Sequence, residues 1–208
     1  MPRVTEEHLT ARRRQILDAA RRCFHRSGFH RTSMQDILTE SELSAGAVYR
    51  YFRGKNEIMM AIANEVVTQV IADVSGTLTA DPPPAVPEAL RAVLTEVDRF
   101  LGPDGELRIA VQVWGESMHD TEMAGFVAGA YQRVRGTFRD YAARARDAGH
   151  LPADSDPDQV GTVLFGLVPG YILQRALIGD PDLATYVAGL TALVAPAPGA
   201  DGPTTGLS

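Results

Sequence analysis

Residues 32–52 read TSMQDILTESELSAGAVYRYF, and the spacing of apolar residues in this stretch decides the fold. It predicts two short helices, near 33–40 and 44–51, joined by a turn of three or four residues. Two helices of about two turns with so short a connection are typical of a helix-turn-helix that binds DNA. The pattern is only moderately specific, because many short helical pairs never touch DNA.

Residues that cap helices stand at both expected helix starts. Thr32 or Ser33 offers a hydroxyl with Gln35 or Asp36 three positions later, which is a capping-box arrangement. Ser44 is placed to cap the second helix. The local sequence therefore indicates where each helix begins.

The second helix carries side chains suited to a DNA surface. Small residues at its start let its N-terminus approach the duplex, where free amides bind phosphate. Tyr49 and Arg50 are long enough to reach base edges or phosphates. We expect DNA contacts from Thr32, Ser33, Ser44, Ala45, Gly46, Tyr49, Arg50, Tyr51 and Lys55, and a core position for Ala47, Val48 and Phe52. An ordinary helical surface is the alternative for each predicted contact.

Charge is distributed unevenly along the chain. The 208 residues contain 20 Lys and Arg against 26 Asp and Glu, a formal net charge of −6, which alone argues against a nucleic-acid partner. Residues 1–55, however, carry eleven basic and six acidic residues, a net +5, and residues 56–208 carry a net −11. Such an asymmetry is expected when only the first part meets a polyanion. A solvated basic face without a partner is the alternative.

Several classes of protein are excluded by what the sequence lacks. The single Cys23 permits no internal disulfide, which argues against a disulfide-stapled secreted domain and fits the cytoplasm. We find no apolar stretch typical of a signal peptide and no unbroken, uncharged apolar run of about 18 residues, so we expect no membrane span. Metal-ligand spacings and catalytic motifs are missing too, so we expect no metal, no cofactor and no enzyme.

The rest of the chain has helical periodicity, which makes the predicted fold class all-α. Residues 157–178 are apolar almost all round, and such a helix is buried on more than one face. In a small chain another copy covers the second face most economically, so this helix and the next, 181–195, are the expected dimer faces. The interface candidates are Val160, Leu164, Leu167, Ile172, Leu183, Val187 and Leu190. Pro169 is expected to kink the first helix or to begin a new segment.

Bulky apolar side chains in this part are candidates for the lining of a small-molecule pocket. They are Trp114, Met118, Phe126, Tyr131, Phe138, Phe165 and Tyr171, and ordinary core packing is the alternative for each. Glu116 lies between two of them along the chain. If it faces inward, the combination of aromatic and acidic groups favours a cationic lipophile; if it faces away, it takes no part in the pocket.

A set of residues spread over 12–63 carries a family resemblance. Its members are Arg14 to Ala20, Phe24, Gly28, Phe29, Thr32, Ser33, Asp36, Ile37, Leu43, Ser44, Gly46, Val48, Tyr49, Tyr51, Phe52, Lys55 and Ile58. In this set the chain resembles the DNA-binding domain of the TetR (tetracycline repressor) family of bacterial transcription regulators. Two positions depart from the pattern: Leu38 stands where the family prefers alanine, and Glu42 where it usually has glycine. Because Glu tolerates a positive φ poorly, we expect a turn strained by roughly 1 kcal/mol or slightly changed in geometry.

The resemblance implies a homodimer whose recognition helices enter the major grooves of a palindromic double-stranded DNA operator. It implies a repressor, released when a small lipophilic effector in the C-terminal domain tilts the helix that begins at Lys55. The corresponding domains are a helix-turn-helix domain over 1–55, an effector-binding and dimerisation domain over 56–195, and a tail, 196–208, expected to be disordered. Two alternatives remain open: a regulator without a small-molecule effector, controlled by a protein or acting as an activator, and a helical enzyme with an incidental basic domain.

Overall fold

The computed structural model describes residues 6–101 and 107–194, and in these ranges the regular structure is entirely helical, which confirms the all-α prediction. The helices are α1 (Glu6–Ser27), α2 (Met34–Ser41), α3 (Ala45–Tyr49), α4 (Lys55–Leu78), α5 (Val86–Arg99), α6 (Leu107–Ser117), α7 (Thr121–Asp147), α8 (Pro157–Ile178) and α9 (Leu183–Val194). The tail expected to be disordered, 196–208, lies outside the described residues.

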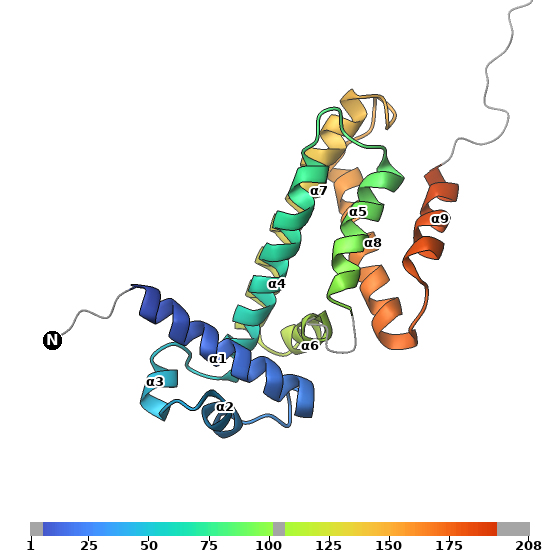
Figure 1. Ribbon diagram of the computed structural model, residues 1–208. Helices are drawn as coiled ribbons and strands as arrows, with labels where there is room; N and C mark the ends of the chain where they lie inside the picture. Colours follow the sequence, from blue (N-terminus) through green and yellow to red (C-terminus); the bar gives the residue numbers. More distant parts are fainter. Residues whose placement is uncertain (1–5, 102–106, 195–208) are drawn as a thin grey trace, which may run out of the picture.

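Helices α1–α3 form a small N-terminal unit at one end of the molecule (Figure 1). Helix α4 rises from this unit into a bundle with α5, α7, α8 and α9, and α6 lies across the end of the bundle beside α1 (Figure 1). The arrangement leaves α4 and α6 as the elements that join the two parts.

The N-terminal unit has a buried core that continues into the bundle. Ile16, Ile37 and Ile58 are fully buried in it. The same cluster includes Ile109 and Val113 of α6, which are 3% and 2% exposed. The core of the N-terminal unit is therefore completed by residues beyond position 55.

Helix α8 is held by neighbours on several sides. A Cβ on Gly161 would lie 2.7 Å from the backbone nitrogen of Arg139 on α7, so the two helices cross too closely for any residue larger than glycine. Tyr171 is fully buried and donates from its hydroxyl to Asp98 Oδ1 of α5 at 2.7 Å. Tyr186 of α9 donates to the backbone carbonyl of Leu167 at 2.8 Å. These contacts fix which face of α8 is turned inward.

The structure bears on two expectations about long apolar segments. Helix α8 continues through Pro169 to Ile178, so the proline does not begin a new segment. By length and mean hydropathy alone, helices α4 and α8 are long and apolar enough to cross a membrane, and the expectation of no membrane span stays a prediction. Both pack against other helices in the bundle (Figure 1).

Candidate nucleic-acid interface and effector cavity

Side chains fix the starts of α2 and α3, as the sequence predicts. The Ser33 hydroxyl accepts from the Asp36 amide at 3.2 Å, and the Asp36 carboxylate accepts from the Ser33 amide at 2.8 Å, which closes the capping box. Hydrogen bonds from the Ser33 backbone and hydroxyl lower the pKa of Asp36. The Ser44 hydroxyl accepts from the Ala47 amide at 3.3 Å. The two-helix motif is thus confirmed together with its caps.

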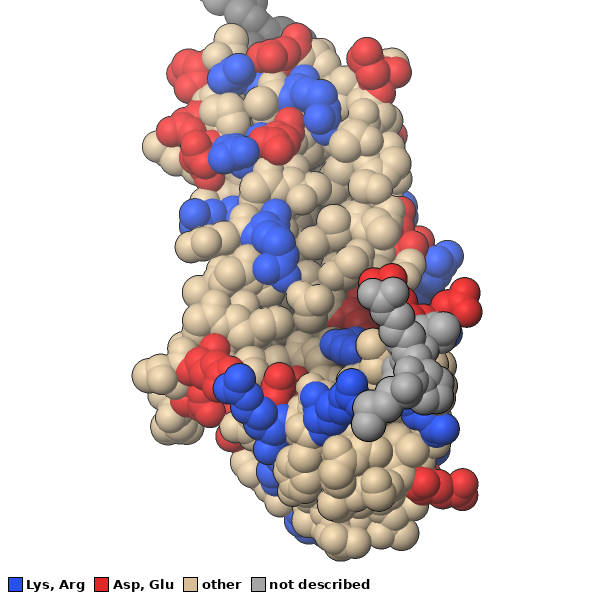
Figure 2. All heavy atoms as spheres, turned by 90° about the vertical axis from the view of Figure 1, so that its left-hand side faces the viewer, with Lys and Arg blue, Asp and Glu red and all other residues tan. Residues whose placement is uncertain are grey.

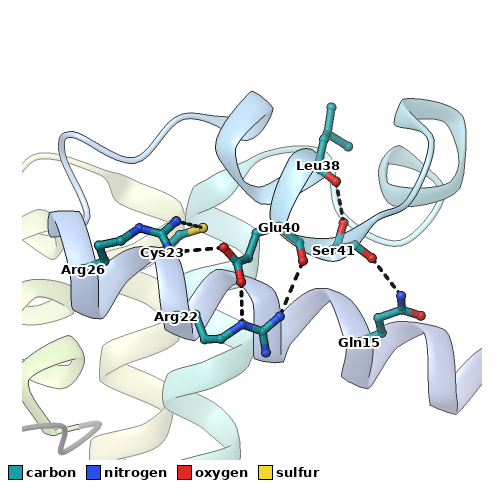
Figure 3. Close-up of polar contacts among 7 residues, drawn as sticks. All are labelled: Gln15, Arg22, Cys23, Arg26, Leu38, Glu40 and Ser41. Atoms are coloured by element: carbon teal, nitrogen blue, oxygen red, sulfur yellow. Dashed lines mark hydrogen bonds and ion pairs between the residues drawn. The ribbon is translucent and has the colours of Figure 1, made fainter.

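The turn between these helices has the left-handed conformation in which glycine is favoured. Glu42 has φ 56° and ψ 29°, so a residue with a Cβ stands where the backbone disfavours one. Support comes from α1, where Gln15 Nε2 donates to the Ser41 carbonyl at 2.7 Å (Figure 3). Arg12 in turn donates to Gln15 Oε1 at 2.8 Å. Hydrogen bonds between α1 and the end of α2 therefore support the strained turn at Glu42.

A second contact between α1 and α2 uses charge. Glu40 accepts from Arg22 Nε at 2.6 Å and from an Arg26 terminal nitrogen at 3.1 Å (Figure 3). Hydrogen bonds first from Arg22 and then from Arg26 lower the pKa of Glu40. The groups are exposed, so each pair adds little stability by itself. Two cations of the basic segment are therefore already paired inside the N-terminal unit and contribute less charge to DNA binding.

The surface around α3 faces solvent. Ser44, Ala45, Gly46 and Arg50 are exposed, and Tyr49 is 49% exposed. A Cβ on Gly46 would meet no atom within 4 Å, so nothing in the described chain crowds the start of this helix. Ser33 is also exposed, and Tyr51 is half-buried against the core. Of the nine predicted DNA contacts, these seven keep some exposed surface.

The other two predicted contacts are corrected. Thr32 is only 2% exposed, and its hydroxyl lies 2.8 Å from the Gly28 carbonyl. Lys55 Nζ donates to the carbonyls of Phe29 at 3.0 Å, His30 at 3.3 Å and Thr32 at 3.1 Å. Because an ammonium has three donors, these bonds occupy all of them. Both side chains hold the loop between α1 and α2 and are not available to a duplex.

Sequence reasoning missed three further cations. Arg14 and Arg53 are exposed and, like Arg50, make no ion pair with any described acid; Arg31 is exposed and bonds only the Ser27 carbonyl. In Figure 2 several Lys and Arg side chains lie in the lower part of the molecule, which carries the N-terminal unit, while others are spread along the rest of this face among acidic groups. The sequence shows that these residues are basic, but it does not show which arginines form ion pairs.

A cavity of about 120 Å³ lies inside the bundle, walled by α4, α5, α6, α7 and α8. Five of the predicted pocket residues line it: Trp114, Phe126, Tyr131, Phe138 and Phe165. None of the described residues along its wall is charged, and valine is the commonest among them. The cavity therefore suits an apolar molecule.

Two pocket expectations are corrected, and the alternative left open for Glu116 is decided. Met118 is 82% exposed, because it lies at the end of α6 where the chain turns into solvent. Tyr171 is buried in the bundle core with its hydroxyl on Asp98, away from the cavity wall. Glu116 faces the N-terminal unit, where its Oε1 lies 3.1 Å from His30 Nε2. The condition for a cationic lipophile, an inward acid, is not met.

The cavity and the N-terminal unit share structural elements. Val113 of α6 and Ala63 of α4 belong both to the core of the N-terminal unit and to the cavity wall. Polar contacts border this junction, since Asn56 at the start of α4 donates to Asp120, the N-cap of α7, at 3.1 Å. Val113 and Ala63 thus connect the cavity wall to the core that supports α1–α3.

Four of the seven predicted dimer residues are buried within their own chain, and the other three are only partly buried. Leu164, Ile172, Val187 and Leu190 are 0–7% exposed within their own chain, and Val160, Leu167 and Leu183 pack partly against the same core. The apolar side chains that α8 and α9 leave exposed are different ones: Val163, Leu173, Leu177, Ile178, Leu193 and Val194. Because the sequence of α8 is apolar all round the helix, its hydrophobic pattern does not show which face is buried and which is exposed.

Both parts of the chain are similar to known proteins. Residues 16–62 match the model of bacterial regulatory proteins of the tetR family, and residues 86–196 match the C-terminal model of BetI-type transcriptional repressors. The HTH-type transcriptional repressor Rv1474c of Mycobacterium tuberculosis is 42% identical over 72 residues, or 35% of this chain and 38% of that relative. The HTH-type transcriptional regulator BetI of Escherichia coli is 25% identical over 181 residues, or 86% of this chain and 90% of that relative. The structure of a SmeT–triclosan complex superimposes with a TM-score of 0.70 at 25% identity, covering 88% of this chain and 91% of that one.

The fold and the exposed two-helix motif define a helix-turn-helix transcription regulator. The chain belongs to the tetR family of bacterial regulatory proteins, since the two family models together cover most of its length. Regulators of this family bind DNA and are not enzymes, so the enzyme alternative is excluded.

Proposed function

We propose that this regulator is a homodimeric repressor that leaves a palindromic operator when a small lipophilic molecule enters the bundle cavity. The observation that carries the proposal is the double role of Val113, which packs in the core beneath α1–α3 and also lines the cavity. A molecule that moves α6 therefore moves a support of the recognition helix.

The open face of α3 supports the DNA-binding step. Tyr49 and Arg50 point away from the core and are free to meet base edges or phosphates. The unpaired cations Arg14, Arg31 and Arg53 add charge for phosphates, because each neutralised phosphate releases counterions. These residues replace Thr32 and Lys55 among the proposed contacts.

The exposed apolar side chains of α8 and α9 support the dimer. Val163, Gly166, Gly170, Leu173 and Leu177 are spaced alternately three and four residues apart, which places them along one stripe of α8. The three apolar side chains of this stripe are exposed in the single chain. Gly166 is exposed with no atom within 4 Å of its Cβ position, so a second copy can approach this stripe closely, and two such stripes suit pairing about a two-fold axis.

The cavity supports a small lipophilic effector. Its wall is uncharged, and its volume of about 120 Å³ approaches the roughly 150 Å³ of an engineered apolar cavity that binds benzene. SmeT, a structural relative, forms a complex with triclosan, as the name of that structure states. A ligand in the cavity is expected to shift α6 as well as to tilt α4, the movement implied by the family, because both helices contribute to the shared wall.

Filling the cavity tests the effector step. Ala130 of α7 is 5% exposed and lines the cavity, so Ala130→Phe occupies it, whereas Ala128→Phe on the exposed side of the same helix leaves it empty. With an operator selected from random DNA, p-xylene is expected to lower the affinity of the native chain and of Ala128→Phe. Ala130→Phe is expected not to respond. Equal release in both variants, measured by fluorescence anisotropy, would contradict the cavity as the effector site.

A further inference from the structure

The cavity in the bundle is long rather than round. Its wall follows α4 from Ala63 to Leu78 and α7 from Phe126 to Phe138. With the rise of an α-helix, these two spans are about 22 Å and about 18 Å long. A compact cavity of about 120 Å³ would reach along only about two turns of a helix, whereas this one follows about four turns of α4. The cavity is therefore a narrow channel.

The channel runs lengthwise between two helices that lie side by side (Figure 1). Three hydrogen bonds join these helices near the start, the middle and the end of α4: Asn56 to Asp120, Arg133 to Asn64, and Arg144 to the Leu78 carbonyl. The bonded residues follow one another in the same order along both helices. Helices α4 and α7 thus run in the same direction, and a ligand between them lies along both.

The two ends of the channel belong to different cores. At one end, Ala63 is part of the core of the N-terminal unit and Phe126 packs against it. At the other end, Leu78 and Phe138 are buried in the core of the bundle. An elongated ligand is therefore suited to contact residues of both cores, whereas a compact ligand contacts fewer of them.

The wall limits the breadth of a ligand. Along α4 it consists mainly of β-branched side chains, whose χ1 angles are restricted, so they do not swing aside easily. They are Val66, Val67, Val70, Ile71 and Val74. Across from them, Tyr131 lies edge-on to Phe165 with centroids 4.8 Å apart, and edge-on to Trp114 at 6.3 Å. Widening the channel would separate these rings, which attract one another in this geometry.

The chemistry of the wall selects an apolar ligand. None of the described wall residues is charged, and nearly all of them are apolar. An ion in the channel would lose its hydration without gaining a counter-charge. A hydrocarbon has no such loss, and it gains free energy with each methylene that it removes from water. Length along the channel therefore adds affinity, while breadth and charge reduce it.

We infer that the effector occupies this channel with a neutral, unbranched aliphatic chain that lies along α4 and α7. The inference rests on the proposed function, because it names the chemical class of ligand for the same cavity. It goes beyond a lipophilic effector in general, since it accepts chains and rejects branched molecules of equal carbon number.

Two isomers test the shape of the site. n-Hexane and 2,2-dimethylbutane have the same formula, but the first is long and thin and the second is short and broad. Trp114 is the single tryptophan of the chain and lines the cavity, so its fluorescence reports binding of each alkane to the full-length protein. We expect n-hexane to bind at least about tenfold more tightly, because the broad isomer overpacks the wall. Calorimetry provides a second measurement.

Chain length tests the direction of the channel. From n-pentane upwards, affinity is expected to rise about fourfold with each methylene until the chain outgrows the channel. Leu78→Ala opens space at the end far from the N-terminal unit, so the rise is expected to continue for about two further methylenes. Leu90→Ala deletes the same side chain at an equally buried position that does not line the cavity, and is expected to leave the limit unchanged. Circular dichroism shows whether both variants are folded.

The possible results separate the class of ligand from the proposed function. Equal binding of the two hexane isomers would overturn the chain class, and an equal length limit in both leucine variants would overturn the run along α4. If neither isomer binds while p-xylene still releases the operator, the chain class fails and the effector site of the proposed function stands. If n-hexane binds as expected but leaves the operator affinity unchanged, the inference stands and only the release step of the proposed function fails.

Discussion

The N-terminal unit and the helical bundle differ in what holds them together. In the N-terminal unit, polar contacts fix the connections between helices. Ser33 closes a capping box, Gln15 donates to the Ser41 carbonyl, and Lys55 donates to three backbone carbonyls. In the bundle, the interior is hollow and apolar, and apolar side chains remain on the surface of α8 and α9. A reading surface needs one fixed geometry, because base contacts depend on distance and angle. A cavity that takes a ligand needs space and helices that shift, so the difference matches the two proposed tasks.

The largest expected effect comes from charging the exposed stripe of the bundle. Val163→Glu combined with Leu177→Glu places two acids on the proposed two-fold face, where partner copies would bury them unpaired. We expect monomers in sedimentation and a loss of operator affinity of at least about a hundredfold, because two half-sites no longer bind together.

Met118→Glu is the matched control for this variant. Met118 is at least as exposed as the stripe residues but lies at the end of α6, away from α8 and α9. It is expected to leave both the dimer and the operator affinity unchanged. A double variant that still sediments as a dimer would move the interface to another surface.

The next effect concerns the reading surface and should be confined to the N-terminal unit. Arg50→Ala removes an exposed cation beside Tyr49, and we expect operator affinity to fall by about 1–3 kcal/mol. If Arg50 meets a phosphate, the slope of log affinity against log salt should also become shallower by about one. Arg91→Ala makes the same charge change at an exposed position of α5 and is expected to alter neither quantity. Equal effects of the two variants in gel-shift titrations would show that net charge, not a local contact, governs binding.

A smaller effect tests how tightly the bundle is packed outside its cavity. Gly161→Ala would place a Cβ 2.7 Å from the backbone of Arg139, and we expect a loss of about 1–3 kcal/mol in the free energy of unfolding. Gly136→Ala lies on the adjoining helix α7 with no atom within 4 Å, and replacing a helical glycine there should stabilise by up to about 1 kcal/mol. Thermal unfolding of both variants checks the sign. A stabilising Gly161→Ala would mean that α7 and α8 can separate without cost.

The candidate site was only partly predictable. The sequence places Tyr49, Arg50 and Gly46 on the exposed side of a short helix, since Val48 and Phe52 mark the buried side through their spacing. It could not reveal that Thr32 is occupied by a backbone carbonyl, because that partner belongs to the preceding loop, whose path depends on α1 and α4. The net charge of +5 over residues 1–55 likewise does not show that Glu40 pairs with both Arg22 and Arg26, because a sum carries no positions.

Local patterns determined the fold class, the two-helix motif, its caps and the family, because each depends on residues a few positions apart. In α8, tertiary structure alone decided which apolar residues are buried. Leu164 and Val163 are neighbours in a helix that is apolar all round, yet the first is buried and the second is 65% exposed. Hydrophobic burial has no direction of its own, so the helices packed against α8 select the face, and those helices lie far away in the sequence. The same reason explains why Pro169, expected to break a helix, stands instead in the wall of a cavity.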